Sequence, residues 1–407
     1  MIYLDHNATT PIAPEVREAM LPYLAEEWGN PSSSYRFGAK LKAVIETARA
    51  QVAELIGASS REIVFTSGAT EANNTVIQAA LKANPTRRHI VTSAVEHSSV
   101  LTLCQALQRE GARVTMLPVN RDGLLNLADL ENAISDETAV VSLMWANNET
   151  GVLFPVERIA ELCRARGVLF HCDAVQAVGK LPVDVRRLPV DYLTLSGHKF
   201  HGPKGVGVLF ARRSAPFTPL IHGGHQERGR RGGTENVALI AGLGVAAERA
   251  RKGVADYAAR VRPLRDALEQ GILGACSSGR QSAPSRERKV QSRLTSAATA
   301  PEGNAGIPNT ELNGHPEQRL PNTTNITFHG VESEALLLLL DQAGVCASSG
   351  SACLADSDEP SHVVRAMKPE SAASRQMVRF SLGWENTPEE IRETLAVLKS
   401  AAAALRG

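Results

Sequence analysis

The sequence predicts an α/β protein with a mostly parallel central sheet, helices on both faces of that sheet, and a smaller α+β domain after it. Between residues 60 and 212, short β-rich runs alternate with amphipathic helical stretches, which is typical of a parallel sheet covered on both sides. The predicted strand at 139–145 (AVVSLMW) is almost entirely apolar, as expected of a strand buried on both faces. At 407 residues the chain is long enough for two domains.

Seven strands are expected in the first domain. They lie at 63–66, 89–93, 113–118, 139–145, 168–172, 192–195 and 206–210, with helices between several of them, for example at 98–109 and 156–166. A long helix from 239 to about 270 leads out of this domain, and helices at 333–342 and 388–405 belong to the smaller one. We expect the large domain to span 11–255, and the small domain to combine 1–10 with 256–407.

The stretch 277–309 differs in composition from the rest of the chain. It is rich in Ser, Arg, Pro and Gly and has few large apolar residues, so it cannot bury enough surface to offset its ordering entropy. We interpret it as a disordered insertion, with order resuming near Asn325. A solvated loop is the simplest interpretation, although its basic cluster could contact RNA or an acidic partner; the cluster comprises Arg280, Arg286, Arg288, Lys289 and Arg293.

Composition indicates a cytoplasmic protein. The 44 Lys and Arg residues are balanced by 43 Asp and Glu residues, which gives no general argument for a nucleic-acid partner. No apolar run is long enough to span a bilayer, and the polar start Tyr3 to Asn7 does not resemble a signal peptide. The six cysteines are scattered, so we expect reduced thiols; only Cys353 has unusual surroundings.

Lys199 lies in the segment SGHKFHGPKG, directly after the strand predicted at 192–195. Ligand-binding loops of open α/β sheets occupy such positions. A lysine there can be an ordinary surface residue, or it can form a Schiff base with a carbonyl cofactor. The neighbouring Ser196 and His198 can donate hydrogen bonds to a phosphate, and the glycines allow close backbone approach. The loop alone leaves both interpretations open.

Other polar segments follow further strands. SGATEANN at 67–74 predicts a glycine turn and a helix N-terminus suited to an anion, and NNETG at 147–151 supplies amides. His97 can cap a helix or stack on a cofactor ring. Asp173 can cap a helix or pair with a pyridinium nitrogen and keep it protonated, which would place Gln176 near the ring's phenolic oxygen. Together, these segments favour one site for a flat ring with a phosphate.

The ordered motifs SGATEANN, EHSSV, NNETG, HCDAVQ, SGHKFHGPKG and RGGTEN resemble the class V aminotransferase group of fold-type I pyridoxal 5′-phosphate (PLP) enzymes. Within that group, YLDHNATT at 3–10 and ASSGSAC at 347–353 resemble cysteine desulfurases of the NifS/IscS type. The similarity runs from residue 3 to about 400, apart from 277–309. It implies an enzyme that converts L-cysteine to L-alanine and transfers the sulfur.

The resemblance also implies a role for individual residues. Lys199 would form the Schiff base with PLP and then remove the substrate's Cα proton, with His97 stacking on the ring and shuttling protons. Asp173 would pair with the pyridine nitrogen and Gln176 with the ring oxygen. The phosphate would be held by Ala69, Thr70, Ser196 and His198, and by Thr234 of a second subunit in a homodimer. Asn148 and Arg379 would hold the substrate carboxylate, and Asn148 would also contact the cofactor.

Cys353 is the expected sulfur acceptor. The segment 347–360 is small, polar and rich in Gly and Ser, so we predict a mobile catalytic loop. The Cys353 thiolate would attack the substrate sulfur, leaving a persulfide and alanine. The persulfide would pass to a partner such as an Fe–S scaffold and could be a transient Fe–S ligand. No fixed metal site is expected, because His222 and His225 lack further ligands nearby.

Three alternatives remain open at this stage. The same fold could serve a selenocysteine lyase or another class V PLP enzyme, although SSGSAC has no purpose in an aminotransferase. The chain could also be a non-catalytic scaffold. The presence of all three expected catalytic residues, Lys199, Asp173 and Cys353, argues against this alternative. The basic insertion could bind RNA. The sulfur's destination is also left open among Fe–S clusters, a nitrogenase-linked route and tRNA thiolation.

Overall fold

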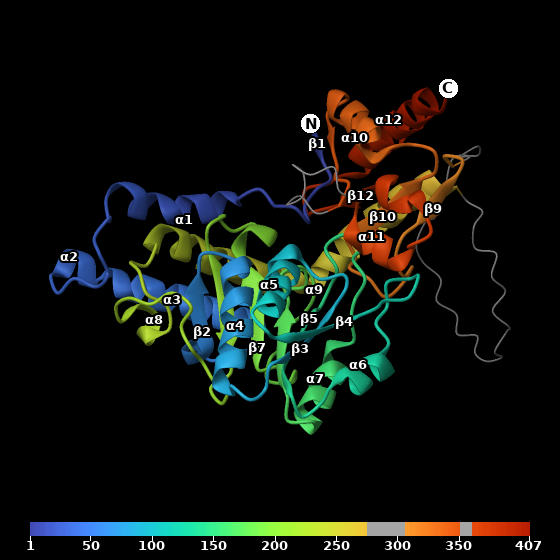
Figure 1. Cartoon of the computed structure of the whole chain (residues 1–407). Coiled ribbons are helices and arrows are strands. Elements are labelled where there is room, and N and C mark those ends of the chain that lie inside the picture. Colours follow the sequence, from blue (N-terminus) through green and yellow to red (C-terminus); the bar gives the residue numbers. More distant parts are fainter. Residues whose placement is uncertain (275–305, 351–359) are drawn as a thin grey trace, which may run out of the picture.

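The computed structural model describes residues 1–274, 306–350 and 360–407 (Figure 1). Cys353, Cys276 and most of the predicted insertion lie outside the described residues. The expected return of order near Asn325 is wrong, because the chain is already structured well before it. Ile307 is 4% exposed within an apolar cluster, and strand β9 spans Thr310–Leu312. The buried side chain of Ile307 orders the end of this stretch, and the average composition of 277–309 does not reveal a single apolar contact of this kind.

The large domain contains a seven-stranded, mostly parallel sheet, which confirms the predicted fold class. The strand order is β2-β8-β7-β6-β5-β3-β4, and only β8 runs against the others, since it pairs antiparallel with both β2 and β7. Every strand begins and ends within one residue of the predicted bounds. The strands are β2 (Ile63–Thr66), β3 (His89–Ser93), β4 (Arg113–Leu117), β5 (Thr138–Met144), β6 (Leu169–Asp173), β7 (Tyr192–Ser196) and β8 (Gly207–Ala211).

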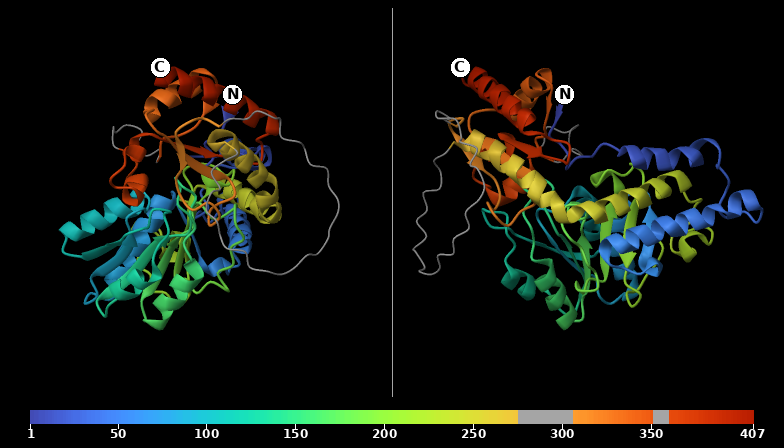
Figure 2. Two further views of the ribbon diagram at one scale, coloured as in Figure 1. Left: turned by 90° about the vertical axis from the view of Figure 1, so that its right-hand side faces the viewer. Right: turned by 180° about the vertical axis from the view of Figure 1, so that it is seen from behind.

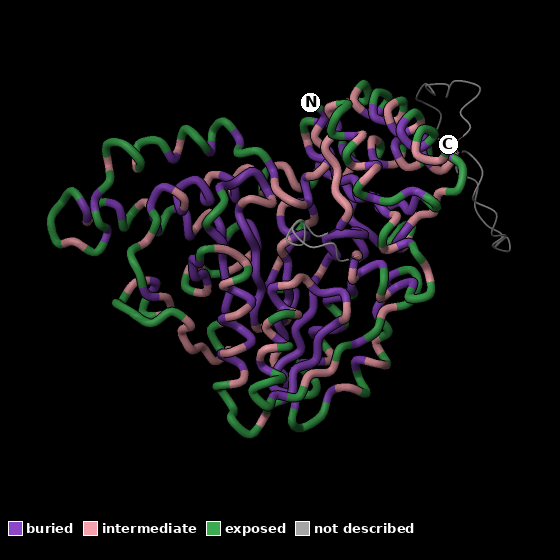
Figure 3. The backbone as a smooth tube through the Cα atoms, turned by 45° about the horizontal axis from the view of Figure 1, so that its top comes forward, coloured by how far each residue is buried: buried purple, intermediate pink, exposed green. Residues whose placement is uncertain are grey.

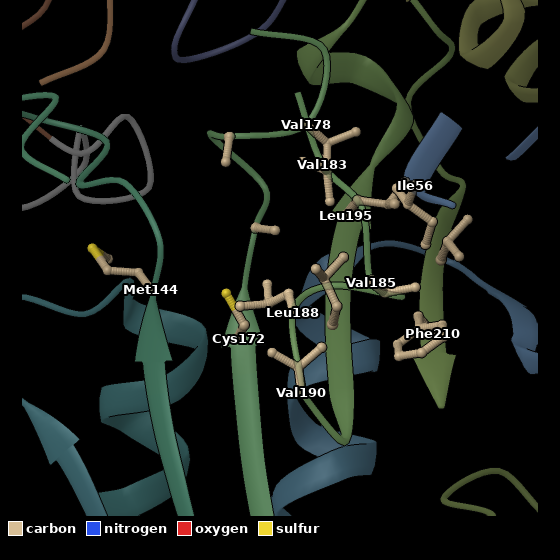
Figure 4. Close-up of a cluster of buried hydrophobic side chains, with 14 of the residues drawn as sticks. Ile56, Met144, Cys172, Val178, Val183, Val185, Leu188, Val190, Leu195 and Phe210 are labelled. Atoms are coloured by element: carbon tan, nitrogen blue, oxygen red, sulfur yellow. The ribbon is translucent and has the colours of Figure 1, made fainter. Parts of the chain in front are cut away.

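Helices cover both faces of this sheet. Alternate residues of β5 point to opposite sides: Val140 packs with α4 (Ala69–Ala83) and α5 (Ser98–Arg109), whereas Val141 packs in the cluster that contains α3 (Leu41–Ile56) and α7 (Val156–Ala165). Figure 4 shows part of that second cluster, in which Cys172 and Leu195 come from neighbouring strands. This two-sided burial explains why the strands read as apolar runs.

The smaller domain is built on a three-stranded antiparallel sheet with β10 (Thr323–Phe328) between β9 and β12 (Met377–Ser381). Helices α10 (Ser333–Gln342) and α12 (Pro388–Arg406) pack on it. The N-terminal strand β1 (Ile2–Tyr3) pairs with β11 (Val345–Cys346), so both chain ends lie at this domain (Figure 2). We propose the boundary 11–255 against 1–10 and 256–407.

The long helix α9 (Val237–Leu273) joins the two domains. Its first half packs in the core of the large domain through Leu243, and its second half packs in the other core through Val261. The remaining helices are α1 (Pro14–Ala25), α2 (Arg36–Ala39), α6 (Leu127–Ala133), α8 (Gln226–Gly229) and α11 (His362–Met367), with 3₁₀ turns at Ser60–Glu62, Gly197–Lys199 and Ala372–Arg375. In the described part of the chain, no helix combines the length and apolarity that a bilayer span requires.

Candidate active site

One cavity is lined by residues from the polar segments that follow the strands. Because β2, β3, β5, β6 and β7 run in the same direction, their carboxyl ends meet at one edge of the sheet. The strands themselves belong to the buried centre of the molecule (Figure 3). The cavity has a volume of about 370 Å³. Its walls include ten of the predicted site residues: Ala69, Thr70, His97, Asn148, Asp173, Gln176, Ser196, His198, Lys199 and Arg379.

Lys199 ends the 3₁₀ turn that follows β7, which places its amine in the cavity. Its Nζ donates hydrogen bonds to two backbone carbonyls of the N-terminal segment, Asn7 O at 2.6 Å and Ala8 O at 2.7 Å. The motif YLDHNATT is therefore part of the site, where it orients the amine.

Asp173 is the last residue of β6 and is 6% exposed. Its Oδ2 accepts a hydrogen bond from Asn73 Nδ2 at 2.8 Å, and its Oδ1 accepts one from Val175 N at 3.1 Å. Asn73 is itself oriented by the Thr194 hydroxyl, which donates to Asn73 Oδ1 at 2.7 Å. The sequence reasoning assigned no role to Asn73, although its place one turn into the helix of SGATEANN was a usable signal. The result is a carboxylate with a fixed direction.

His97 caps α5. Its Nδ1 accepts the backbone N–H of Ser99 at 3.1 Å, so the proton of the neutral ring is on Nε2. Burial lowers the pKa of His97 below its ordinary value; the positive charge of Lys199 acts in the same direction and Asp173 opposes it. The ring is thus a neutral imidazole that can stack on an aromatic cofactor.

An anion cradle forms where α4 begins at Ala69. The first N–H groups of this 15-residue helix have no partner within the helix, and its dipole favours negative charge. A Cβ on Gly207 would lie 2.6 Å from the carbonyl carbon of Gly68, so the turn can approach β8 only because residue 207 is glycine. His198 adds a neutral donor, because burial first, then Lys199 and Lys204, lower its pKa to about 3.

Arg379 lies on β12 at the domain junction and is 1% exposed. Its Nη2 donates to Asp5 Oδ1 at 2.6 Å and its Nη1 to Asn148 O at 3.1 Å. Within the described residues, Arg379 Nε and Asn148 Oδ1 are buried without a hydrogen-bond partner. Buried polar groups are normally paired, so the free N–H of Arg379 Nε fits a site that a bound carboxylate completes, whereas Asn148 Oδ1 can only accept a hydrogen bond. The role of Asp5 was also missed from the sequence.

One predicted residue does not line this cavity, and another lies outside the described residues. Thr234 is exposed on the loop after α8 and does not line it. Cys353 lies outside the described residues, but the segment leading to it begins next to the site: Ser348 and Arg379 exchange backbone hydrogen bonds of 3.2 and 2.7 Å. Among the residues that the structure describes, no cluster of three or more His, Cys, Asp or Glu side chains is arranged for a metal ion.

The donor set fits PLP. A lysine amine, a fixed carboxylate, a neutral imidazole and an anion cradle surround one cavity, as the aldehyde, ring nitrogen, ring face and phosphate of that cofactor require. The fold and the site are therefore those of a PLP-dependent enzyme.

Comparison with known proteins agrees with this assignment. The chain matches the aminotransferase class-V family over residues 2–298 and 289–393. It is 48% identical to cysteine desulfurase 2 of Trichormus variabilis, covering 100% of this chain and 94% of the relative, and 47% identical to cysteine desulfurase NifS of Azotobacter vinelandii, covering 100% and 93%. Among solved structures, a NifS-like protein aligns with a TM-score of 0.85 at 33% identity over 99% of both chains.

The chain belongs to the aminotransferase class-V family. Its activity is the PLP-dependent desulfuration of L-cysteine, as in its cysteine desulfurase relatives.

Proposed function

We propose that the cavity residues divide this reaction among them as follows. Lys199 holds PLP covalently and then acts as the base at the substrate Cα, and Asp173 keeps the pyridine nitrogen protonated. PLP, once bound, supplies an electron-withdrawing ring that makes the Cα proton removable. The observation that carries the proposal is the convergence of ten predicted site residues, from segments far apart in the sequence, on one cavity.

The substrate carboxylate is held by Arg379 and Asn148. The unpartnered Nε of Arg379 offers a free donor on a guanidinium whose two Nη atoms each already donate one hydrogen bond, to the Asn148 carbonyl and to Asp5. A solved relative described as SspA in complex with cysteine, with a TM-score of 0.77 at 32% identity, is consistent with a cysteine site in this fold.

Cys353 takes the sulfur. Its thiolate attacks the substrate sulfur, an S–S bond forms, and the Cβ–S bond breaks with its electron pair passing to carbon. That carbon gains a proton and becomes the methyl group of L-alanine. The start of the segment at Ser348, bonded to Arg379, supports delivery of Cys353 to this cavity. The outer sulfur of the persulfide, a transient Fe–S ligand in this proposal, then passes to a cytoplasmic acceptor protein such as an Fe–S scaffold. Cys104, Cys163 and Cys172, buried as free thiols, fit a reducing compartment.

A homodimer completes the phosphate site. Thr234 cannot serve the cavity of its own chain from its exposed loop, which suits a contact with the partner's phosphate. Large apolar side chains are exposed near the same end of the molecule as α8, on α1 and the segment after it (Figure 1); they are Leu21, Leu24, Trp28, Tyr35 and Phe37. Trp28 is 72% exposed, and a second copy of the chain would cover this apolar side chain.

The test combines three proteins: the unmodified chain, Lys199→Ala and Cys353→Ala. With PLP and L-cysteine, the unmodified chain should form alanine and a persulfide on Cys353, detected by mass spectrometry of the intact protein. Lys199→Ala should do neither. Cys353→Ala should bind PLP and L-cysteine normally but release little sulfur; sulfur release at the native rate would remove Cys353 from the mechanism. Light scattering of Trp28→Asp beside the unmodified chain tests the dimer.

A further inference from the structure

Lys180 is a buried lysine for which the proposed chemistry has no use. It is 3% exposed, and its Nζ donates hydrogen bonds to Gln176 Oε1 at 2.6 Å and Asn7 Oδ1 at 2.8 Å. The charges that act on it most are the cations Lys199 and Arg379. Burial, then these two cations, hold the pKa of Lys180 well below its ordinary value. A lysine in such a place needs a reason, because burying an amine without a carboxylate is unfavourable.

Asn7 determines where the Lys180 amine points. Asn7 is 1% exposed, and its Nδ2 donates to Asn148 O at 3.1 Å and Thr323 Oγ1 at 2.9 Å. With both amide hydrogens used, its Oδ1 must face the other side, where it accepts from Lys180 and from Asn322 Nδ2 at 3.1 Å. Residues of both domains thus fix this oxygen, and the oxygen fixes the amine.

The amine in turn determines which way the Gln176 amide faces. Its Oε1 accepts from Lys180, and its Nε2 donates to Asn7 O at 3.0 Å. Rotating the amide by 180° would set its nitrogen against the lysine amine and its oxygen against a carbonyl. Gln176 lines the cofactor cavity. The second hydrogen on Nε2 is therefore the group that the amide can offer to a ligand.

We propose that Lys180 is a positioning residue that holds the Gln176 amide with an N–H group toward the phenolic oxygen of PLP. The inference rests on the proposed role of Gln176 as the partner of that oxygen. An N–H group stabilises the deprotonated oxygen, whereas an amide carbonyl in the same place would repel it. Lys180 therefore acts on the cofactor through Gln176, without contacting it.

The first test follows the pH-dependent absorbance of the PLP-loaded protein. Lys180→Met should raise the pKa at which this absorbance changes by about one unit. This is a tenfold change in proton affinity, which is the scale of one hydrogen bond to a charged group. Gln176→Leu should raise it at least as much. The double variant should match Gln176→Leu alone, because Lys180 has then nothing left to position. The exposed Lys82→Met on α4 is the matched control and should leave the transition unchanged.

Two results would overturn the proposal. One is an unchanged transition in Lys180→Met. The other is full additivity in the double variant, which would mean that Lys180 acts directly through its charge, together with the neighbouring Lys199, Arg379, His6 and His198. Lys180→Arg keeps the donors and should restore the native transition, since a second cavity of about 480 Å³ borders Lys180 and can take the larger side chain. Lys180→Leu, which also lacks a donor, replaces Lys180→Met if that variant does not fold.

A second measurement is independent of the cofactor. In PLP-free protein, urea unfolding of Lys180→Met, Gln176→Leu and the double variant should be non-additive, because the two side chains contact each other directly. If the losses of unfolding free energy in the two single variants add up in the double variant, the contact between Lys180 and Gln176 contributes nothing, and the proposal fails independently of PLP. If the loaded protein shows no absorbance that depends on Lys199, the proposed cofactor chemistry fails, while this measurement still decides the contact.

Discussion

The buried ion pair between Arg49 and Glu227 attaches α8 to the rest of the large domain. The two side chains are 3% and 2% exposed and share two hydrogen bonds, of 2.6 and 2.8 Å. Glu227 Oε2 also accepts the backbone N–H of Phe65 on β2 at 2.8 Å, while Arg49 Nη1 donates to Ile63 O at 3.1 Å. Burial opposes the charge on Arg49, but its hydrogen bond with Glu227 raises the pKa above its ordinary value.

Arg49→Met should destabilise the protein strongly. It leaves the Glu227 carboxylate buried with the Phe65 N–H as its remaining partner in the described structure, and breaking a buried pair in this way costs about 3–5 kcal/mol of unfolding free energy. Replacing both residues by Met removes the stranded charge, so the double variant should recover most of the loss. Urea unfolding of the three variants measures both quantities.

The matched control is an exposed pair. Lys252 and Glu248 on α9 are 66% and 37% exposed, so Lys252→Met should cost at most about 1 kcal/mol. A loss of that small size in Arg49→Met would refute the reasoning. The pair also bears on function, because the loop that carries Thr234 follows directly after α8, which contains Glu227. Arg49→Met should therefore bind PLP more weakly, and adding Thr234→Ala should weaken it little further.

Three other predictions concern residues that line the cavity or lie next to its lining. Burial raises the pKa of Glu96 to about 8 from an ordinary 4.5, so between these pH values the folded state keeps a proton that the unfolded chain releases. The unfolding free energy should therefore fall by about 1.4 kcal/mol per pH unit as the pH rises through this range. Glu96→Gln should remove this pH dependence, which urea unfolding at pH 5 and 8 measures. Asn73→Ala lets the Asp173 carboxylate turn, so PLP should still bind while kcat falls roughly 10- to 100-fold in a steady-state alanine assay. Arg379→Lys loses the fork, and KM for L-cysteine should rise about 10- to 100-fold with a smaller change in kcat.

Each of these has a contrary outcome. A Glu96→Gln variant whose pH profile matches the unmodified chain would show that Glu96 ionises normally in the fold. Equal kcat in Asn73→Ala would mean that Asp173 needs no second partner. A fall in kcat without a rise in KM for Arg379→Lys would place Arg379 away from the substrate carboxylate.

Local pattern determined much of this protein. The strand bounds follow from short apolar runs ended by polar segments, and those ends carry the chemistry. Because parallel strands share one carboxyl edge, the alternation of strands and helices sufficed to bring His97, Asp173 and Lys199 into one cavity. Motif resemblance then identified the cofactor and the reaction, which the family comparison confirms.

Only the tertiary structure decided which side chains hold those residues in place. Asn73 on Asp173, Asp5 on Arg379, and Lys180 on Asn7 are hydrogen bonds between partners that local patterns do not pair. The antiparallel course of β8 is of the same kind, since a strand's apolar pattern is identical in either direction. Periodicity reports which face of an element is buried. Which element packs against that face depends on the tertiary arrangement of the whole chain, which a local sequence pattern does not specify.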